Sequence, residues 1–252
     1  MEVKDMHVIV TGGASGIGRA TAMLLARQGA SVVVGDIDRA GGAAVAAEAL
    51  GQGLSLSFFP LDLTSAESAH EFVRQAASVK GRIDGLVNSA GWDHVEPFMD
   101  NDPQLWEKLI AINLLGPIRL TRNVLEHMTK AKVGRIVNIS SDAGRVGSMG
   151  ETVYSACKGG TIAFTKALAR EMARFKINVN CVCPGPTDTP LLHAQTSDWA
   201  MRIKEGMTRA VPFRRLAAPV EIAEGIAFFL SPASGFVTGQ VLSVSGGLTM
   251  AG

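Results

Sequence analysis

The loop Thr11-Gly12-Gly13-Ala14-Ser15-Gly16-Ile17-Gly18 lies between an apolar segment and an alanine-rich segment of helical periodicity. Its glycines allow a tight turn and let the backbone approach a pyrophosphate, which free N–H groups at a helix N-terminus can bind. A turn that needs glycine only for its sharp bend is the alternative. The position between a strand and a helix favours a dinucleotide-binding unit, and its candidate cofactor residues are Gly12, Ser15, Gly16, Ile17 and Gly18.

The rest of the chain repeats this alternation of short apolar runs and longer helical segments. The expected strands are His7–Thr11, Ser31–Asp36, Leu54–Pro60, Ile83–Asn88, Gly134–Ser140, Ile177–Cys183 and Gln240–Val244. The expected helices are Gly16–Gln28, Arg39–Leu50, Ala66–Lys80, Pro103–Lys130, Thr152–Phe175 and Val220–Leu230. Continuous apolar strands are typical of buried parallel sheets, and right-handed crossovers place helices on both faces. The pattern predicts one α/β domain over residues 1–252, with a doubly wound seven-stranded parallel sheet.

One long segment without clear periodicity, Pro184–Pro219, interrupts this alternation. Irregular segments of this length in compact α/β domains are uncommon and often close over an active site. We expect a substrate lid at about residues 186–216.

Composition excludes several classes of protein. The chain has 252 residues, of which 47% are hydrophobic and 19% charged, enough for one large core. A net charge of +1 without long charged runs argues against nucleic-acid and membrane partners. Cys157, Cys181 and Cys183 lack the neighbours of a zinc site and fit reduced thiols in a cytoplasmic protein without a metal. The apolar run after Asp5 is too short for a signal peptide or a membrane span.

Asp36 ends the second expected strand, about twenty residues beyond the glycine loop. A carboxylate at this position accepts hydrogen bonds from the adenosine ribose and repels a 2′-phosphate. Ser15 and Ile37 are uncharged where an enzyme that uses NADP tends to carry Arg or Lys, although Arg39 is close. The sequence therefore favours NAD over NADP, with Asp36 and Ile37 at the ribose.

Tyr154, the only tyrosine of the chain, precedes Lys158 by four residues. On a helix the two side chains share one face, and a nearby ammonium group lowers a phenol pKa from its usual ~10. The pair could exchange a proton with a substrate near neutral pH. A half-buried tyrosine beside a solvated lysine is the alternative.

Together these motifs resemble the short-chain dehydrogenase/reductase family across nearly the whole chain. The matching segments are TGGASGIG, PLDLT with Asp62, NSAG from Asn88 to Gly91, Asn113, IVNISS ending at Ser141, YSACK and PGPTDT from Pro184 to Thr189. The resemblance implies a single-domain Rossmann fold, usually tetrameric, and assigns catalysis to Asn113, Ser141, Tyr154 and Lys158. Tyr154 would transfer the proton, Ser141 would orient the substrate oxygen, and Lys158 would lower the phenol pKa and hold the nicotinamide ribose.

The role of Asn113 has a further argument in the sequence. Pro117, four residues downstream in a helical run, lacks the N–H group that would bond the Asn113 carbonyl. A water held there would link Lys158 to solvent, as the family resemblance implies. A structural kink is the alternative.

The resemblance also assigns the remaining cofactor contacts. Asp62 and Leu63 would border the adenine, Asn88, Ala90 and Gly91 its ribose, and Pro184, Gly185, Thr187 and Thr189 the nicotinamide. Ser89 replaces the second asparagine that is usual in this motif. Tyr154 and Lys158 would also contact the cofactor.

The substrate side is mostly apolar. Its candidate residues are Trp92, His94, Ser141, Arg145, Val146, Met149, Leu191, Leu192 and Trp199. A surface position for His94 and a solvated Arg145 are the alternatives. Within the family, the sequence around these residues is most similar to dehydrogenases of alicyclic hydroxyacyl-CoA compounds, of the 2-hydroxycyclohexanecarboxyl-CoA dehydrogenase type.

Three functions remain open at this point. The first is NAD-dependent interconversion of a secondary alcohol and a ketone, on a cyclic hydroxyacyl-CoA or a related alicyclic alcohol. The second is 3-oxoacyl carrier-protein reduction with NADPH, against which Asp36 and the non-basic Phe175, paired with Lys132 at the carrier-docking positions, both count. The third is a dinucleotide-binding protein without catalysis, since a fold does not fix a function.

Overall fold

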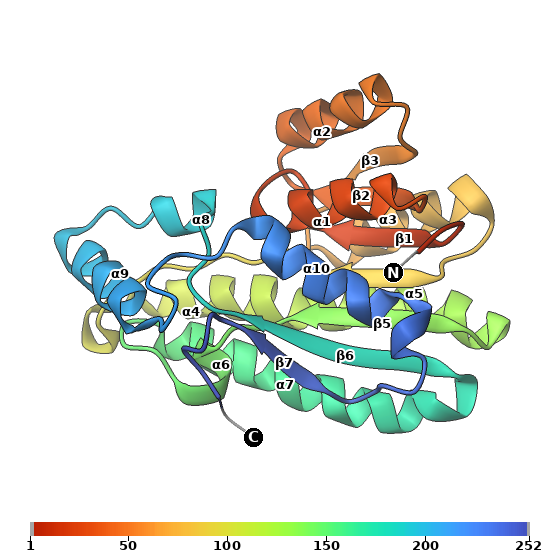
Figure 1. The fold of residues 1–252 in the computed structure, drawn as a ribbon. Helices are drawn as coiled ribbons and strands as arrows, with labels where there is room; N and C mark the ends of the chain where they lie inside the picture. Colours follow the sequence, from red (N-terminus) through yellow and green to blue (C-terminus); the bar gives the residue numbers. More distant parts are fainter. Residues whose placement is uncertain (1–2, 251–252) are drawn as a thin grey trace.

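The computed structural model describes residues 3–250, and its centre is a parallel sheet of seven strands (Figure 1). The strands are β1 (His7–Thr11), β2 (Ser31–Asp36), β3 (Leu56–Pro60), β4 (Gly85–Asn88), β5 (Gly134–Ile139), β6 (Ile177–Pro184) and β7 (Val241–Val244). Their spatial order is β3-β2-β1-β4-β5-β6-β7, and every neighbouring pair is parallel. The order reverses between β1 and β4, which is where doubly wound sheets bind ligands.

Helices cover both faces of the sheet. They are α1 (Gly16–Arg27), α2 (Arg39–Gly51), α3 (Ala66–Lys80), α4 (Pro103–Ile110), α5 (Gly116–Ala131), α6 (Ala143–Val146), α7 (Thr152–Met172), α8 (Pro190–His193), α9 (Asp198–Ala210) and α10 (Pro219–Leu230). Short 3₁₀ turns are η1 (Phe98–Asp100), η3 (Ala173–Phe175) and η4 (Pro232–Ser234), and η2 (Ala111–Leu115) is π-helical.

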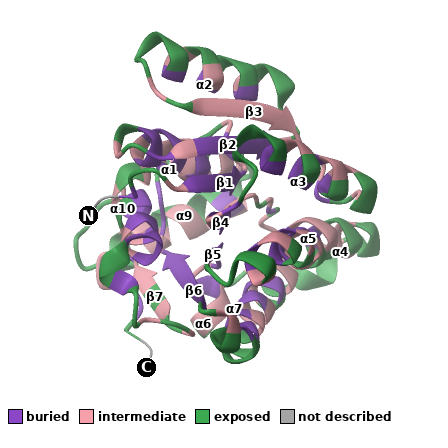
Figure 2. Cartoon of the chain, turned by 90° about the vertical axis from the view of Figure 1, so that its right-hand side faces the viewer, coloured by how far each residue is buried: buried purple, intermediate pink, exposed green. Residues whose placement is uncertain are grey.

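Alternation along the strands divides the core into two layers. Successive side chains of a strand point to opposite faces, so Val8 and Val10 pack with α1 and α10, whereas Ile9 packs with α3, α5 and α7. Figure 2 shows the central strands buried, with β3 at intermediate exposure on the outer edge. The parallel register brings the carboxyl ends of the strands, and the loops that follow them, to one edge.

The predicted elements are found with changed boundaries. β3 begins at Leu56 instead of Leu54, and β4 at Gly85 instead of Ile83. Leu54 and Ile83 pack against the core from the preceding loops, so their apolar character reflects burial without strand pairing. The expected lid is partly helical, since it contains α8 and α9.

The expected helix Pro103–Lys130 is interrupted by the π-helical turn η2. The N–H group of Gly116 donates to the carbonyl of Ala111, five residues back, instead of four. Pro117 follows at once and has no N–H to donate, so the regular ladder cannot pass through this point. Asn113 therefore lies in an irregular turn of an otherwise helical segment.

Candidate active site

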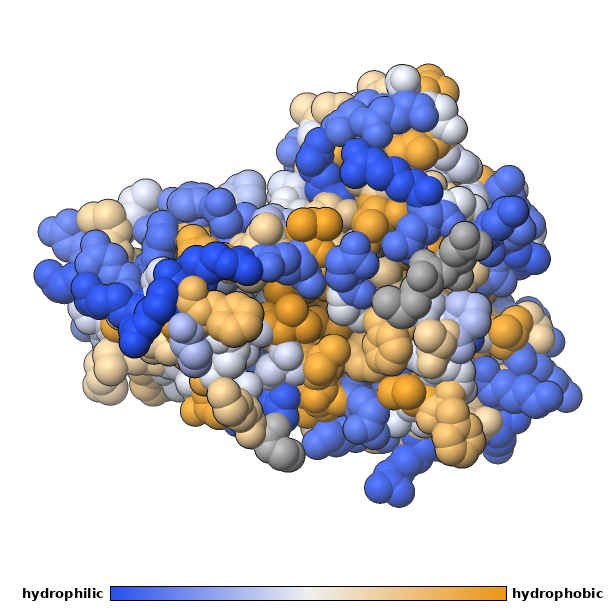
Figure 3. Space-filling view, viewed as in Figure 1, coloured by the Kyte–Doolittle hydropathy of each residue, from blue (hydrophilic) through white to orange (hydrophobic). Residues whose placement is uncertain are grey.

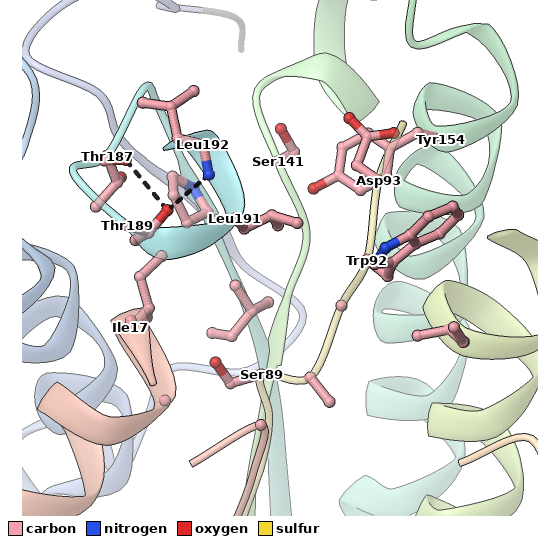
Figure 4. Close-up of a pocket in the computed structure, with 18 of the residues that line it drawn as sticks. Ile17, Ser89, Trp92, Asp93, Ser141, Tyr154, Thr187, Thr189, Leu191 and Leu192 are labelled. Carbon is pink, nitrogen blue, oxygen red and sulfur yellow. Dashed lines mark hydrogen bonds between the residues drawn. The ribbon is translucent and has the colours of Figure 1, made fainter. Parts of the chain in front are cut away.

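A cavity of about 560 Å³ opens at the carboxyl edge of the sheet, between the glycine loop after β1 and the segments after β4, β5 and β6. Figure 4 shows Thr187, Thr189 and Leu191 on one side of it and Ser141, Tyr154 and Trp92 on the other. Both the glycine loop and the Tyr154–Lys158 helix line this same cavity.

The glycine loop is packed too closely for side chains. A Cβ on Gly12, whose φ is +67°, would lie 2.6 Å from the Cα of Ala90, and a Cβ on Gly18 would lie 2.1 Å from the carbonyl oxygen of Gly12. Ser15 precedes α1 in extended conformation and makes no side-chain capping bond, and the first turn of α1 holds no acidic residue. This bare helix N-terminus fits the diphosphate of a dinucleotide.

Thr11 joins the loop after β1 to the loop after β4. Its hydroxyl oxygen accepts the N–H groups of Ser89 at 3.1 Å and Ala90 at 3.0 Å. The motif comparison did not single out this role of Thr11. The bonds hold Ala90 against Gly12, so the two loops form one rigid wall.

Asp36 lies at the end of β2, where it lines the cavity and holds the glycine loop. One carboxylate oxygen accepts the N–H of Ala14 at 3.0 Å, and the other accepts the N–H of Asp38 at 3.0 Å. Ile37 beside it is exposed and also lines the cavity, whereas Arg39 is outside the lining. An oriented carboxylate with an apolar neighbour fits a ribose with free hydroxyl groups.

Helix α7 presents Tyr154 and Lys158 to the cavity. The Lys158 ammonium is buried, lies 5.4 Å from the Tyr154 ring centroid and donates to the carbonyl of Ile139 at 3.0 Å. The hydroxyl of Ser140 donates to the carbonyl of Lys158 at 2.7 Å, so Ser140 fixes the helix, and both Ser140 and Ser141 line the cavity. Of the two serines, Ser141 forms the hydrogen bond with the Tyr154 phenol, and its catalytic role stays a prediction.

The ionisation of Tyr154 differs from the expectation based on Lys158. Burial raises the phenol pKa well above its usual value, the nearby carboxyl groups of Asp93 and Glu151 raise it further, and a hydrogen bond with Ser141 lowers it. Burial also lowers the pKa of Lys158. Desolvation outweighs the cation in this site, so the phenol is a proton donor at neutral pH.

Asn113 is buried and organises the loop after β4. Its side-chain amide donates to the carbonyl oxygens of Trp92 at 2.7 Å and Leu109 at 3.0 Å, and its Oδ1 accepts the N–H of Trp92 at 3.2 Å. Its backbone carbonyl, which the sequence places without a helix partner, has the Thr161 hydroxyl at 3.5 Å, the limit of a hydrogen bond. Asn113 itself does not line the cavity.

Most of the predicted cofactor residues surround this one cavity. Its lining includes Gly12, Ser15, Gly16, Ile17, Gly18, Asp36, Ile37, Asp62, Leu63, Ala90, Gly91, Tyr154, Lys158, Pro184, Gly185, Thr187 and Thr189. Asn88 is the exception. It is buried beneath the lining and donates to Thr121 at 2.9 Å and to Asn138 at 2.8 Å, which ties β4 to β5.

The predicted substrate residues divide into two groups. Trp92, Ser141, Leu191 and Leu192 line the cavity, whereas His94, Arg145, Val146, Met149 and Trp199 do not. Their positions follow from other contacts. His94 approaches Glu96 at 3.9 Å, Arg145 donates to Ser243 at 3.0 Å, and Val146 and Met149 are exposed. Trp199 packs over Gly150, where a Cβ would lie 2.3 Å from the indole ring.

Several lining residues were missed by motif comparison, among them Asp93, Val95, Lys108, Glu151, Gln195 and Met207. Asp93 follows Trp92 directly, and Glu151 precedes Tyr154 by three residues, so their positions next to known motifs were the available signal. Gln195 fixes the loop that contains Asp93 and Val95. Its side chain donates to the Asp93 carbonyl at 2.9 Å and accepts the Val95 N–H at 3.1 Å.

Residues 3–250 contain no candidate metal site and no membrane-spanning helix. Within that range no group of three or more His, Cys, Asp or Glu side chains is arranged to hold a metal ion. Among the helices of the same range, none combines the length and apolar character needed to cross a membrane.

Comparisons with known proteins agree with this geometry. A family model described as enoyl-(acyl carrier protein) reductase matches residues 12–249. The cis-4-hydroxycyclohexanecarboxylate dehydrogenase of Sinomonas cyclohexanicum is 41% identical over 96% of this chain and 95% of its own. The 3-oxoacyl-[acyl-carrier-protein] reductase of Thermotoga maritima is 36% identical over 99% of this chain and 100% of its own. A crystal structure of an actinorhodin polyketide ketoreductase variant with NADPH superimposes with a TM-score of 0.91, at 34% identity, covering 98% of this chain and 99% of that one.

The fold and the cavity define an oxidoreductase of the Rossmann type that binds a nicotinamide dinucleotide. The sequence matches then identify the protein family. The chain belongs to the short-chain dehydrogenase/reductase family.

Proposed function

We propose that the protein interconverts a secondary alcohol and a ketone with NAD. The observation that carries this proposal is the shared cavity: Tyr154, Lys158 and Ser141 line one part of it, and the glycine loop and Asp36 line another. The cofactor, when bound, supplies the site that accepts or donates the hydride.

The reaction also requires a proton to move at the substrate oxygen, and Tyr154 is the group placed to move it. Its hydroxyl, bonded to Ser141, donates to the carbonyl oxygen in the direction of reduction. Ser141 positions the same oxygen by a second hydrogen bond. The buried Lys158 ammonium stabilises the phenolate that remains. Asn113 acts indirectly, because its side chain holds the backbone of Trp92 and so positions the loop that lines the cavity.

NAD is the proposed cofactor because Asp36 is held toward the cavity by two backbone N–H groups. The 2′-phosphate of NADP would be repelled by this carboxylate, and the neighbouring Ile37 supplies no positive charge to offset the repulsion. The NADPH of the ketoreductase structure belongs to that protein and leaves the preference of this chain to experiment.

The proposed substrates are alicyclic alcohols, including cyclic hydroxyacyl-CoA compounds. The hydroxycyclohexanecarboxylate dehydrogenase supports a ring substrate, and Ile112, Leu191, Leu192 and Met207 give the cavity apolar walls. A panel of cyclic secondary alcohols, free and as CoA thioesters, followed at the nicotinamide absorbance with NAD and NADP, tests both substrate and cofactor. No turnover with any of them would contradict the proposal.

Reduction of 3-oxoacyl carrier protein with NADPH is the second candidate, favoured by full-length similarity to the Thermotoga maritima reductase. Of the two carrier-docking positions, Lys132 is exposed and basic. Phe175 at the other position is not basic, and the guanidinium carbon of Arg174 lies over its ring, 4.7 Å from the ring centroid. Turnover of acetoacetyl carrier protein faster than any cyclic ketone would favour this function. A dinucleotide-binding protein without catalysis would bind NAD and turn over neither substrate.

A homotetramer and a cytoplasmic location remain predictions. Figure 3 shows apolar atoms gathered over the face where α10 and the edge strand β7 lie. Val220 on α10 and Leu242 on β7 are exposed there. Burial of this surface across a two-fold axis fits the closed symmetry of soluble oligomers, and light scattering at micromolar concentration measures the assembly.

A further inference from the structure

Two acidic side chains, Asp93 and Glu151, meet at the substrate end of the cavity. Asp93 follows the loop after β4, Glu151 precedes α7, and both line the cavity close to the Tyr154 phenol. The two carboxyl groups are within hydrogen-bonding reach of each other. Figure 4 shows Asp93 on the same side of the cavity as Tyr154.

Neither carboxyl group is explained by the stability of the fold. Asp93 is buried, with a relative exposure of 6%, and its Oδ1 has no donor among the surrounding protein N–H and O–H groups. Oε2 of Glu151 is also buried without a partner. Glu151 occupies the N-cap position of α7 and makes no capping bond, although a side chain there usually bonds a free N–H group. A proton held between the two carboxyl groups satisfies one contact. The remaining acceptor sites of the pair still need a partner, because unsatisfied buried polar atoms destabilise a protein, and this points to a ligand.

The lid holds this arrangement in place. Gln195 binds the backbone on both sides of His94, at Asp93 and Val95. The N–H of Glu96 donates to the carbonyl of Gly150 at 3.0 Å, which brings the loop of Asp93 beside the residue that precedes Glu151. The pair is thus part of a fixed wall.

The charge of the pair selects among possible ligands. Burial, together with the hydrogen bond to Glu151 and its charge, raises the pKa of Asp93 to about 9. Asp93 is therefore protonated at neutral pH, and its carboxyl O–H can donate to Glu151. The groups that face it are the Tyr154 phenol, the Lys158 ammonium and the Cys157 thiol.

We propose that Asp93 and Glu151 bind a second, uncharged hydroxyl group of the substrate, adjacent to the hydroxyl or carbonyl group that reacts at Tyr154. This assignment rests on the proposed alcohol dehydrogenase activity and names its substrate class. Once Asp93 has donated its one proton to Glu151, only acceptor sites are left in the pair, so the ligand must donate hydrogen bonds. A carboxylate would be repelled. An ammonium group would add a second cation beside the Lys158 ammonium, which already faces the pair.

The test compares four ring substrates: cyclohexanol, vicinal cyclohexanediol, vicinal aminocyclohexanol and vicinal hydroxycyclohexanecarboxylate. We expect kcat/KM for the diol to exceed that for cyclohexanol by roughly ten- to a hundredfold, the range for hydrogen bonds to charged groups. Glu151→Ala should remove this preference, so that the kcat/KM values for the diol and for cyclohexanol become equal within a few-fold, whatever the variant does to the rate that both substrates share through the Tyr154 phenol. Glu96→Gln is the matched control, because Glu96 is a nearby acid outside the cavity lining and should keep the preference.

The outcomes separate the two proposals. Turnover of cyclohexanol and the diol at equal efficiency would overturn the hydroxyl site and leave the dehydrogenase intact. A preference for the amino alcohol or the carboxylate over the diol would also overturn it.

A second readout does not depend on turnover. Tyr154 is the only tyrosine, so the absorbance of its phenolate reports this one group. Removing a negative charge favours the phenolate, and we expect Glu151→Gln to lower the titration midpoint by at least about one pH unit. The diol should also lower the midpoint of the unmodified protein, and cyclohexanol should not. If no alcohol is turned over, this titration still decides the site, and an equal midpoint in all cases would overturn it.

Discussion

The side chain of Asn113 and the backbone of Trp92 form two reciprocal hydrogen bonds, with Nδ2 donating to the carbonyl at 2.7 Å and Oδ1 accepting the N–H at 3.2 Å. This amide-to-backbone pair fixes the loop that carries Trp92 and Asp93 into the cavity. It gives Asn113 a positioning role that its place in the family motif does not reveal.

Asn113→Ala should therefore lower both stability and activity. The variant leaves the Trp92 backbone groups without their buried partner, which costs about 1–3 kcal/mol for each unsatisfied group. Urea unfolding at neutral pH measures the loss. A lower kcat at full stability would instead leave only a role in proton transfer for Asn113.

Tyr154→Phe should abolish the proton transfer while keeping the cofactor site. Turnover should fall by roughly 10²–10⁴-fold, the usual contribution of a general acid or base, with NAD affinity almost unchanged. Lys158→Ala should weaken NAD binding as well. Retention of more than about a tenth of the activity in Tyr154→Phe would exclude Tyr154 as the proton donor.

Alcohol oxidation should become faster as the pH rises above neutrality. Oxidation needs the phenolate of Tyr154, and burial with the charges of Asp93 and Glu151 raises the pKa of this phenol. Reduction needs the protonated phenol and should keep its rate in the neutral range. Profiles of kcat/KM against pH in both directions check this, and an oxidation rate that is flat between neutral and alkaline pH would contradict it.

Cofactor choice should depend on Asp36. Two unit charges ~4 Å apart repel by roughly 4 kcal/mol at an effective dielectric of ~20. Half of this, about 2 kcal/mol, corresponds to a preference for NAD of roughly thirtyfold. Asp36→Ala should narrow the preference, weaken NAD binding and free the N–H of Ala14 in the glycine loop, and Ile37→Arg should narrow the preference further.

Asp38→Ala is the matched control for Asp36. Asp38 caps α2 by accepting the N–H of Gly41 at 3.0 Å and is outside the cavity lining. Its loss should reduce stability by about 1 kcal/mol without changing the cofactor preference. Equal kcat/KM values for NAD and NADP in the unmodified protein would show that Asp36 does not select the cofactor.

Asp93→Asn should stabilise the protein, increasingly so toward alkaline pH. The pKa of Asp93 is raised from 3.8 to about 9, so between these values the folded state binds a proton that the unfolded state has released. Stability then falls as the pH rises, by up to about 1.4 kcal/mol per pH unit. The variant removes this loss. Thermal unfolding at acid and alkaline pH measures it against Glu96→Gln, and a gain that is greatest at low pH would contradict the raised pKa.

The fold and the cofactor half of the site could be predicted because both depend on local sequence. Apolar runs locate the strands, and the glycine loop is read within eight residues. Helix capping is local as well: α3 begins where the Ser65 hydroxyl accepts the N–H of Ser68 and ends at Gly81, whose φ is +70°.

The substrate half could not be predicted in the same way. Asp93 and Glu151 are separated by more than fifty residues and meet only when their loops pack together, and the sequence of neither loop indicates this contact. Arg145 and Met149 lie in the chain between Ser141 and Tyr154, two proposed catalytic residues, yet the short helix α6 and the turn after it direct them away from the cavity. The pKa of Tyr154 likewise depends on how deeply the phenol is buried. The four-residue spacing between Tyr154 and Lys158 does not indicate this burial.

The hydrogen bond between the segment that contains Ser141 and strand β7 also has a consequence for folding during synthesis. Asp142, next to Ser141, accepts a hydrogen bond of 2.5 Å from Ser243, which lies 101 residues later in the chain. At the usual rate of about 5–20 residues per second, this partner is synthesised roughly 5–20 s after Asp142. Until then the segment that contains Ser141 lacks one of its supports, and the neighbouring strand β6 has an unpaired edge. The nascent chain must remain protected from aggregation through this interval, so demand for chaperones should be greatest before β7 is added.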